Sequence, residues 1–173
     1  MISRGVNLNG RKMTENKEMQ ESNDSPGVIA LPPVIFVAAM VVGFAVEWLS
    51  PSTFLASGSL TVAGIVLLAA GVVMIGLGIL QHRRSSNDPD PRNPDVTVMT
   101  SGIYRRTRNP IYIGYFMILA GIGVWANSLW VLSTVIPAHF VVRWGVVARE
   151  ETYLEAKLGQ TYTDYKNSVR RWF

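Results

Sequence analysis

The sequence has 173 residues, no cysteine and only two histidines. These absences exclude disulfide frameworks, thiolate nucleophiles and cysteine-ligated metals, and two histidines do not make a metal site. Charged residues are also missing from long stretches. Glu47 is the only Asp, Glu, Lys or Arg between positions 28 and 80, and none occurs from position 111 to position 142. Such runs are not typical of soluble core helices, so the sequence predicts a membrane protein.

The apolar runs predict an all-α, polytopic membrane protein with about four transmembrane helices. The 32 residues from 111 to 142 exceed one span of about 20 and fall short of two, so we extend this stretch to about Val147. Asn127 and Ser128 mark a tight turn inside it, which predicts a C-terminal helical hairpin. The expected spans are residues 28–49, 60–81, 110–126 and 128–147.

The remaining segments are polar. Residues 1–27 are expected to form a disordered tail, residues 82–109 the large cytoplasmic loop and residues 148–173 a cytoplasmic C-terminal segment. Residues 28–173 would then form a single transmembrane domain. Within the second span Gly64, Gly71 and Gly78 recur every seven residues, which predicts a helix face that packs closely against another helix.

Positive charge predicts the orientation in the membrane. The net charge of +4 is compatible with nucleic-acid binding, but all sixteen Lys and Arg fall in the tail, in the large loop or in the C-terminal part of the chain from Arg143 onward. This distribution follows the positive-inside rule and places both termini in the cytoplasm. We therefore expect a multi-pass protein of a bacterial-type inner membrane, with no nucleic-acid partner.

Two polar clusters could carry chemistry at this membrane face. The first turns at Pro110 into the third span and contains Arg108, Asn109 and Tyr112; the neighbouring Arg105 and Arg106 fit either anchoring or a site. In the second, His139, Arg143 and Glu150 fall within about 40° of one another on a helix, with Glu151 adjacent. The glutamates would otherwise be a solvated helix end paired with Arg143 or Arg149, and His139 alone fits a packing role.

At these residues the sequence resembles the isoprenylcysteine carboxyl methyltransferase and phospholipid methyltransferase superfamily. The resemblance covers about residues 93–172, and family members commonly have His where Asn109 stands, which weakens an acid or base role at that position. It is carried by Arg108-Asn109-Pro110-Ile111-Tyr112-Ile113-Gly114, Glu150-Glu151, Leu158-Gly159, Tyr162, Tyr165 and Val169-Arg170-Arg171-Trp172.

The resemblance implies an enzyme that takes S-adenosylmethionine from the cytoplasm and a lipidic or hydrophobic acceptor, a carboxylate or an amine, from the bilayer. A Gly-x-Gly near the cofactor is matched by Gly76-Leu77-Gly78 and, in competition, by Gly121-Ile122-Gly123, although both also fit helix packing. The residues expected to contact the cofactor are Tyr112, Glu150, Glu151, Gly76, Gly78 and His139, and the expected catalytic group is Arg108, Asn109, Arg143 and Glu150.

Elementary chemistry agrees with these roles. Carboxylates can receive the amine, sulfonium and ribose hydroxyls of the cofactor, and Arg108 or Arg143 can clamp its carboxylate. Methyl transfer is an in-line displacement that needs alignment and exclusion of water rather than a metal. A carboxylate acceptor needs no base, an amine acceptor could use a glutamate or His139, and Arg143 could hold an acidic acceptor.

Two alternatives remain open from the sequence. Membrane sterol and steroid reductases that use NADPH have a similar Arg-(His/Asn)-Pro-x-Tyr segment, but typically with an Arg-Asp pair and a Lys-Tyr-Gly step where this chain has Glu150-Glu151 and Leu158-Gly159. A non-enzymatic membrane protein would tolerate replacement of both glutamates. The sequence determines neither the methyl acceptor nor the oligomeric state.

Overall fold

The computed structural model describes residues 27–53, 60–86, 98 and 100–172. The predicted tail, except Gly27, and residues 87–97 and 99 of the predicted loop therefore lie outside the described residues. Within them all regular structure is helical and no strand occurs, which confirms the all-α prediction. The helices are α2 (Pro32–Leu49), α3 (Thr61–Ser86), η1 (Gly102–Arg105), α4 (Pro110–Trp125), α5 (Leu129–Ser133), α6 (Val135–Val142), η2 (Arg143–Val147), α7 (Ala148–Leu158) and α8 (Gln160–Ser168).

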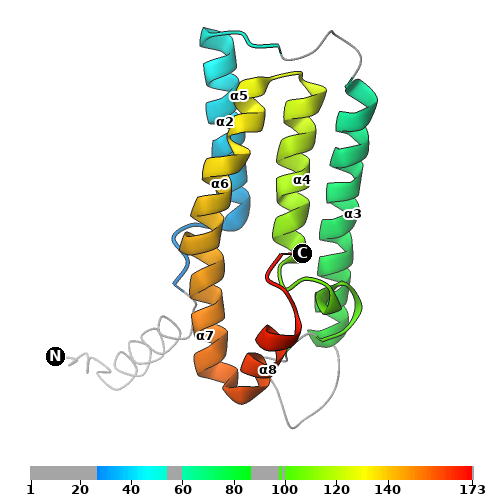
Figure 1. Cartoon of the computed structure of the whole chain (residues 1–173), viewed down its shortest axis with the longest axis vertical. Helices are drawn as coiled ribbons and strands as arrows, with labels where there is room; N and C mark the ends of the chain where they lie inside the picture. Colours follow the sequence, from blue (N-terminus) through cyan, green and yellow to red (C-terminus); the bar gives the residue numbers. More distant parts are fainter. Residues whose placement is uncertain (1–26, 54–59, 87–97, 99, 173) are drawn as a thin grey trace, which may run out of the picture.

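The long helices form a bundle in which α2, α3, α4 and the run from α5 to α7 lie side by side (Figure 1). Helix α3 packs along α4, while α2 packs against α5 and α6. The C-terminal segment returns from α8 to the beginning of α4, at the same end of the bundle as η1 (Figure 1). This end, where α3 finishes and α4 begins, holds the polar clusters found in the sequence.

Three helical stretches are long and apolar enough to cross a membrane: Pro32–Leu49, Thr61–Arg84 and Leu129–Leu158, with mean hydropathies of 1.9, 2.6 and 1.5. Helix α4 is equally apolar, but its 16 residues rise only about 24 Å, less than the roughly 30 Å of a hydrocarbon core. The described residues thus contain three helices of spanning length, which supports an integral membrane protein.

Glycines let α3 and α4 approach closely. A Cβ atom on Gly64 would lie 2.5 Å from the Trp125 backbone nitrogen, and one on Gly71 would lie 2.7 Å from the Gly114 carbonyl oxygen. On Gly78 it would lie 2.6 Å from Ile111. The predicted close-packing face of the second span is therefore confirmed, and its partner is the whole length of α4.

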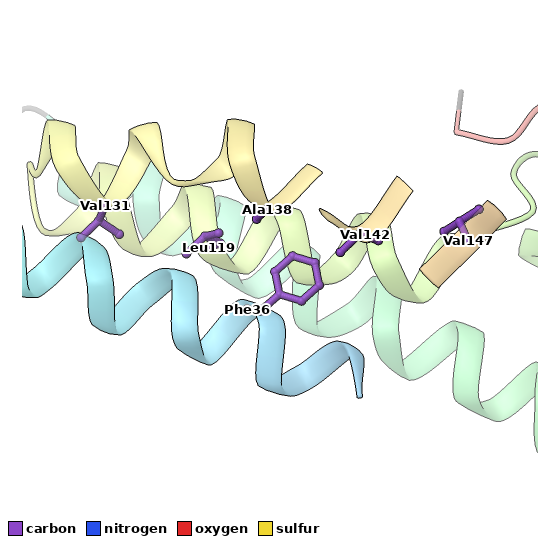
Figure 2. Close-up of a cluster of buried hydrophobic side chains, with 6 residues drawn as sticks. All are labelled: Phe36, Leu119, Val131, Ala138, Val142 and Val147. Carbon is purple, nitrogen blue, oxygen red and sulfur yellow. The ribbon is translucent and has the colours of Figure 1, made fainter. Parts of the chain in front are cut away.

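The apolar core fills the space between α2, α4 and the run from α5 to α7. Figure 2 shows Phe36 of α2 beneath a row of small side chains from the opposing helices. Burial of these side chains holds the helical run from α5 to α7 against α2 and α4. It thereby fixes the position of the polar residues in α7. The buried set is Phe36, Leu119, Val131, Ala138, Val142 and Val147.

Glu47, the only charge in the first span, ties the far end of the bundle together. Its Oε2 accepts hydrogen bonds from the Ser128 hydroxyl at 2.5 Å and the Ser52 hydroxyl at 2.9 Å. Ser128 in turn accepts a hydrogen bond from Val131 N and caps α5, in the turn that the sequence predicts and where Asn127 has a φ of 50°. A carboxylate with several hydrogen bonds is tolerated at a helix end in a membrane.

Two helices run further than the expected spans. Residues 82–86, which the sequence assigned to the loop, continue α3. The helical stretch that begins at Leu129 continues past Val147 to Leu158. In both cases the added residues are mainly polar or charged but compatible with helix, so the helix outlasts its apolar part. Hydropathy marks where a span ends rather than where a helix ends.

Candidate functional site

The segment before α4 is shaped by contacts to the C-terminal residues. Pro110 opens α4, and Asn109 precedes it without capping the helix through its side chain. Instead Asn109 Nδ2 donates a hydrogen bond to the Arg171 carbonyl oxygen at 3.0 Å. The buried Thr107 hydroxyl donates to the same oxygen at 3.2 Å. Asn109 is thereby committed to positioning the chain, which agrees with an amide having no acid or base function.

Further contacts fix the C-terminal segment beside this turn. Arg108 N donates to the Arg170 carbonyl oxygen at 3.0 Å, after α8 has ended at Ser168. The buried Tyr165 hydroxyl donates to the Tyr104 carbonyl oxygen of η1 at 2.9 Å. Burial raises the pKa of Tyr165 to about 12, so its phenol stays protonated and keeps this hydrogen bond at neutral pH.

Glu151 lies between two arginines. Arg171 Nε donates to Glu151 Oε1 at 3.0 Å and Arg171 Nη2 to Oε2 at 2.6 Å, a bidentate pair. Arg108 Nη1 lies 3.1 Å from Oε1, within ion-pair distance but outside hydrogen-bonding geometry. The side chains of Glu151 and Arg108 are only 7% and 9% exposed. The hydrogen bonds that Arg171 donates to Glu151 raise the pKa of Arg171. Both carboxylate oxygens of Glu151 therefore have an arginine partner.

Glu150 differs from its neighbour in its partners. Its Oε1 accepts a hydrogen bond from the Tyr112 hydroxyl at 2.7 Å, which joins α7 to the first turn of α4. Among the described residues no Lys or Arg forms an ion pair with Glu150. Tyr104 is buried nearby, and its pKa is raised by burial and then by the negative charge of Glu150. Glu150 is therefore a half-buried carboxylate with no cationic partner among the described residues.

A widened turn separates the glutamates from the apolar part of the helix. Residues Arg143–Val147 form a π-helical segment, and Ile29 packs into the space left by the missing side chain of Gly145. A π segment changes the phase of a helix, so an angle counted at 100° per residue does not carry from Arg143 to Glu150. In the structure His139 meets Phe116 and Glu150 meets Tyr112, on successive turns of α4.

His139 packs against an aromatic group formed by Phe116 and Trp172. The His139 ring lies 5.6 Å from the Phe116 ring and 5.3 Å from the Trp172 ring, measured between centroids. Trp172 Nε1 and Arg143 Nε are buried and have no hydrogen-bond partner. The C-terminal segment thus connects this aromatic group to the ion cluster, because Trp172 follows Arg171 directly.

The two expected glycines have different surroundings. Gly78 faces Ile111, next to Tyr112 in the chain, whereas a side chain on Gly76 would meet no atom within 4 Å. In the competing Gly121-Ile122-Gly123, a Cβ on Gly121 would press on Leu68 and one on Gly123 on Leu132. Packing accounts for three of these four glycines and not for Gly76.

The site therefore combines complementary groups at one end of the bundle. Glu150 offers negative charge, and the deeply buried Arg108 has Nε and Nη1 without hydrogen-bond partners. Among the described residues no group of three or more His, Cys, Asp or Glu is placed to hold a metal ion. This arrangement suits a ligand that carries both a cationic and an anionic group.

The family model for phospholipid methyltransferases matches residues 60–161, well over half of the chain. The chain belongs to the phospholipid methyltransferase family. The match begins at α3 and includes α4 and the helical hairpin. It also includes Glu150 and Glu151. The family supports a membrane methyltransferase, as expected from the residues around Arg108 and Glu150.

Two relatives of this phospholipid methyltransferase family member are informative. An uncharacterized protein of Haemophilus influenzae is 43% identical over 63 residues, which cover 36% of this chain and 98% of that protein. A protein-S-isoprenylcysteine O-methyltransferase of Schizosaccharomyces pombe is 33% identical over 82 residues, 45% of this chain. The chain spans about a third of the length of the yeast enzyme, since the match covers 33% of it. No solved structure matches the chain.

Several residues of the cluster had no role assigned from the sequence. Arg171 pairs with Glu151, and Trp172 joins the aromatic group. Tyr162 is buried, and its pKa is raised by burial and by Glu151, against the opposing charge of Arg108. Their signal in the sequence was their place in the C-terminal motif that carries the family resemblance, which assigned them no role. Spacing along the chain did not indicate that this segment folds back.

Proposed function

We propose that this family member is an S-adenosylmethionine-dependent methyltransferase acting on a lipidic or hydrophobic acceptor, a carboxylate or an amine, at the cytoplasmic membrane face. The observation that carries the proposal is the contrast between the paired glutamates. Glu151 is satisfied by two arginines, whereas Glu150 is held by Tyr112 and lacks a cation. A half-buried carboxylate of this kind is suited to a cationic ligand group.

The side chains fit this cofactor. S-adenosylmethionine supplies an activated methyl group on a sulfonium, and it also carries an amine, a carboxylate and ribose hydroxyls. Glu150 and Tyr112 would hold the cationic or hydroxyl groups. Arg108 would hold the carboxylate through its buried Nε, which has no acceptor among the described residues, while Nη1 stays beside Glu151. Buried N–H groups without acceptors cost free energy, so a ligand that supplies acceptors is stabilised there.

Other expected site residues have supporting roles in this proposal. Asn109 and Glu151 position Arg108 and the C-terminal segment rather than meeting the cofactor through free groups. Gly78 lets α3 approach the first turn of α4, while the open surface at Gly76 leaves room near the end of α3. His139 forms the boundary between the glutamates and the apolar core.

The chemistry that these residues must perform is modest. Hydrogen bonds to Thr107, Arg108 and Asn109 fix the segment before Trp172. In this proposal that segment would exclude water from the reacting groups. A carboxylate acceptor is ionised at neutral pH and needs no base. An amine acceptor must lose a proton, which His139 or Glu150 would take.

The proposal includes the arrangement in the membrane. Helix α4 is the third of four spans, residues 28–173 are one domain, and the tail, the large loop and the C-terminal segment lie in the cytoplasm. Supporting this, the described Lys and Arg lie at the end of α3, before α4, or from Arg143 onward, and none lies near the turn at Asn127. A bacterial-type inner membrane is the expected location.

Calorimetric titration of the detergent-purified protein with S-adenosylmethionine and, separately, with NADPH tests the function. Glu150→Gln is expected to weaken S-adenosylmethionine binding about tenfold or more, because a charged hydrogen bond is lost. Glu155→Gln is the matched control on the same helix, since Glu155 pairs with Lys166 away from Tyr112. Binding of NADPH alone would assign the chain to a reductase, and binding of neither would refute an enzyme that uses these cofactors.

A further inference from the structure

The segment that leads into α2 crosses the π-helical turn between α6 and α7. Ile29 N donates a hydrogen bond to the Gly145 carbonyl oxygen at 3.2 Å, so this oxygen has a partner from outside its helix. Arg149 Nη1 donates to the Gly27 carbonyl oxygen at 2.6 Å. Residues 27–31 therefore form a strap that is fixed to the helix within the π turn and again just after it.

Gly145 provides the room for the strap. A Cβ atom at this position would overlap Cδ1 of Ile29 and lie 2.7 Å from its Cγ1, so any larger residue would displace Ile29. Gly145 is buried, whereas Ile29 is 53% exposed. Only the tip of the Ile29 side chain thus enters the helix surface, and the strap lies on the outside of the bundle. The match to the phospholipid methyltransferase family begins at α3, so the strap is outside the matched residues.

The π turn decides which side chains of α7 face α4. Arg143–Val147 is π-helical, and Ala148 N donates to the carbonyl oxygen five residues earlier. A π turn holds about one residue more than an α turn, so it turns every later residue back by about 100°, the rotation of one residue. In an uninterrupted α-helix Arg149 would therefore take the angular position of Glu150, and Glu150 that of Glu151.

We propose that Ile29 and Gly145 are positioning residues for the site. Their contact holds the π turn and so keeps Glu150, rather than Arg149, opposite Tyr112. An arginine at that position would repel the cationic ligand group that Glu150 is suited to hold. The consequence for cofactor binding rests on the proposed function, whereas the register of α7 does not.

The hydrogen bond between Arg149 and Gly27 favours the same register. Arg149 is exposed, and Gly27 holds its guanidinium on the outer side of α7. If α7 returned to an uninterrupted α-helix, Arg149 would move by about 100° around the helix axis and leave the strap. Both contacts of the strap are therefore formed in the register that presents Glu150, and they stabilise this register relative to the α-helical one.

The register can be measured without any ligand, because the chain has no cysteine to compete with introduced labels. In the full-length protein, the exposed Ala156 of α7 is replaced by cysteine and paired with Val73→Cys of α3 or with Val41→Cys of α2. Spin labels at each pair give a distance by pulsed electron paramagnetic resonance. A turn of about 100° moves a side chain on a helix about 10–12 Å across by about 8 Å, which references on two different helices detect.

Matched variants test the strap on this labelled background. Ile29→Ala removes the tip that enters the helix surface, and Gly145→Ala both displaces Ile29 and favours the α-helix. Each is expected to add a second distance population, shifted by up to about 8 Å. Leu31→Ala, in the same strap with a side chain that is 69% exposed, is expected to leave the distances unchanged. The double variant Ile29→Ala, Gly145→Ala is expected to shift no further than the stronger single variant, because both changes break one contact.

The distances decide the strap itself. Circular dichroism at the helical band reports whether each variant is folded, and Ile29→Ala decides alone if Gly145→Ala does not fold. A second population in Ile29→Ala that is absent from Leu31→Ala would support the proposal. Wild-type distances in folded Ile29→Ala protein would overturn it, as would an equal shift in Leu31→Ala.

Calorimetry with S-adenosylmethionine on the same variants tests the link to the site. Affinity falls with the fraction of molecules that keep Glu150 opposite Tyr112, so a shift of about half to nine-tenths of the population weakens binding about two- to tenfold. Shifted distances with unchanged affinity would refute the positioning of the site by the strap. Wild-type protein that binds no cofactor, while the distances of the variants are shifted, would refute the proposed function alone.

Discussion

The pairing of Glu151 with two arginines predicts that the adjacent glutamates differ sharply in their effect on stability. Glu151→Gln removes the negative charge between Arg108 and Arg171 and leaves two cations facing each other. Arg108 is 9% exposed and Arg171 28% exposed, so water screens the first of them poorly. Removing one partner of a buried pair typically costs about 3–5 kcal/mol.

Glu150→Gln is the matched comparison. Gln can still accept the hydrogen bond from Tyr112, and no ion pair of the described residues is broken. We expect a cost below about 1 kcal/mol. For a chain of this size each kcal/mol lowers the unfolding temperature by roughly 2–4 °C. Glu151→Gln should therefore unfold at least about 6 °C below wild type, and Glu150→Gln within about 4 °C of it.

Circular dichroism at the helical band, followed during heating in one detergent, measures both variants and the cycle with Arg171→Gln. The double variant Glu151→Gln, Arg171→Gln is expected to lose less than the sum of its two single variants, because they share one interaction. Equal unfolding temperatures for the two glutamate variants, or strict additivity in the cycle, would refute the conclusion that the ion pairs of Glu151, and not the carboxylate of Glu150, stabilise the fold.

Further predictions use the same melting assay. Gly71→Ala should cost about 1–3 kcal/mol by overpacking against α4, whereas Gly76→Ala, on open surface of the same helix, should not destabilise; equal effects would contradict the packing. Ser128→Ala should cost about 1–3 kcal/mol, because Glu47 loses a hydrogen bond and α5 its cap; unchanged melting would count against that tie. The raised pKa of Tyr165 gives stability that is complete below pH 10 and lost as pH rises toward about 12; Tyr165→Phe should flatten this decline, and an identical pH profile would argue against it.

Local patterns predicted the helices well because each depends on neighbouring residues. The uncharged runs indicated the long apolar helices, Pro110 indicated the beginning of α4, and the seven-residue glycine spacing located the face of α3 that meets α4. The extensions to Ser86 and Leu158 were missed because hydropathy reports burial in lipid, while polar residues can continue a helix into water.

The candidate site was predictable only as a list of residues. The sequence by itself determined that Arg108, Asn109, Tyr112 and the two glutamates are candidates, because their types and order are those of the family. It did not determine that Glu151 would form an ion pair with Arg171 while Glu150 has no cationic partner among the described residues. That difference arises because the C-terminal residues fold back across α4, and such long-range contacts depend on packing rather than on local sequence. Among the described residues, the tertiary structure alone decided which of the two adjacent carboxylates has arginine partners, since ion pairs from distant segments reach only Glu151.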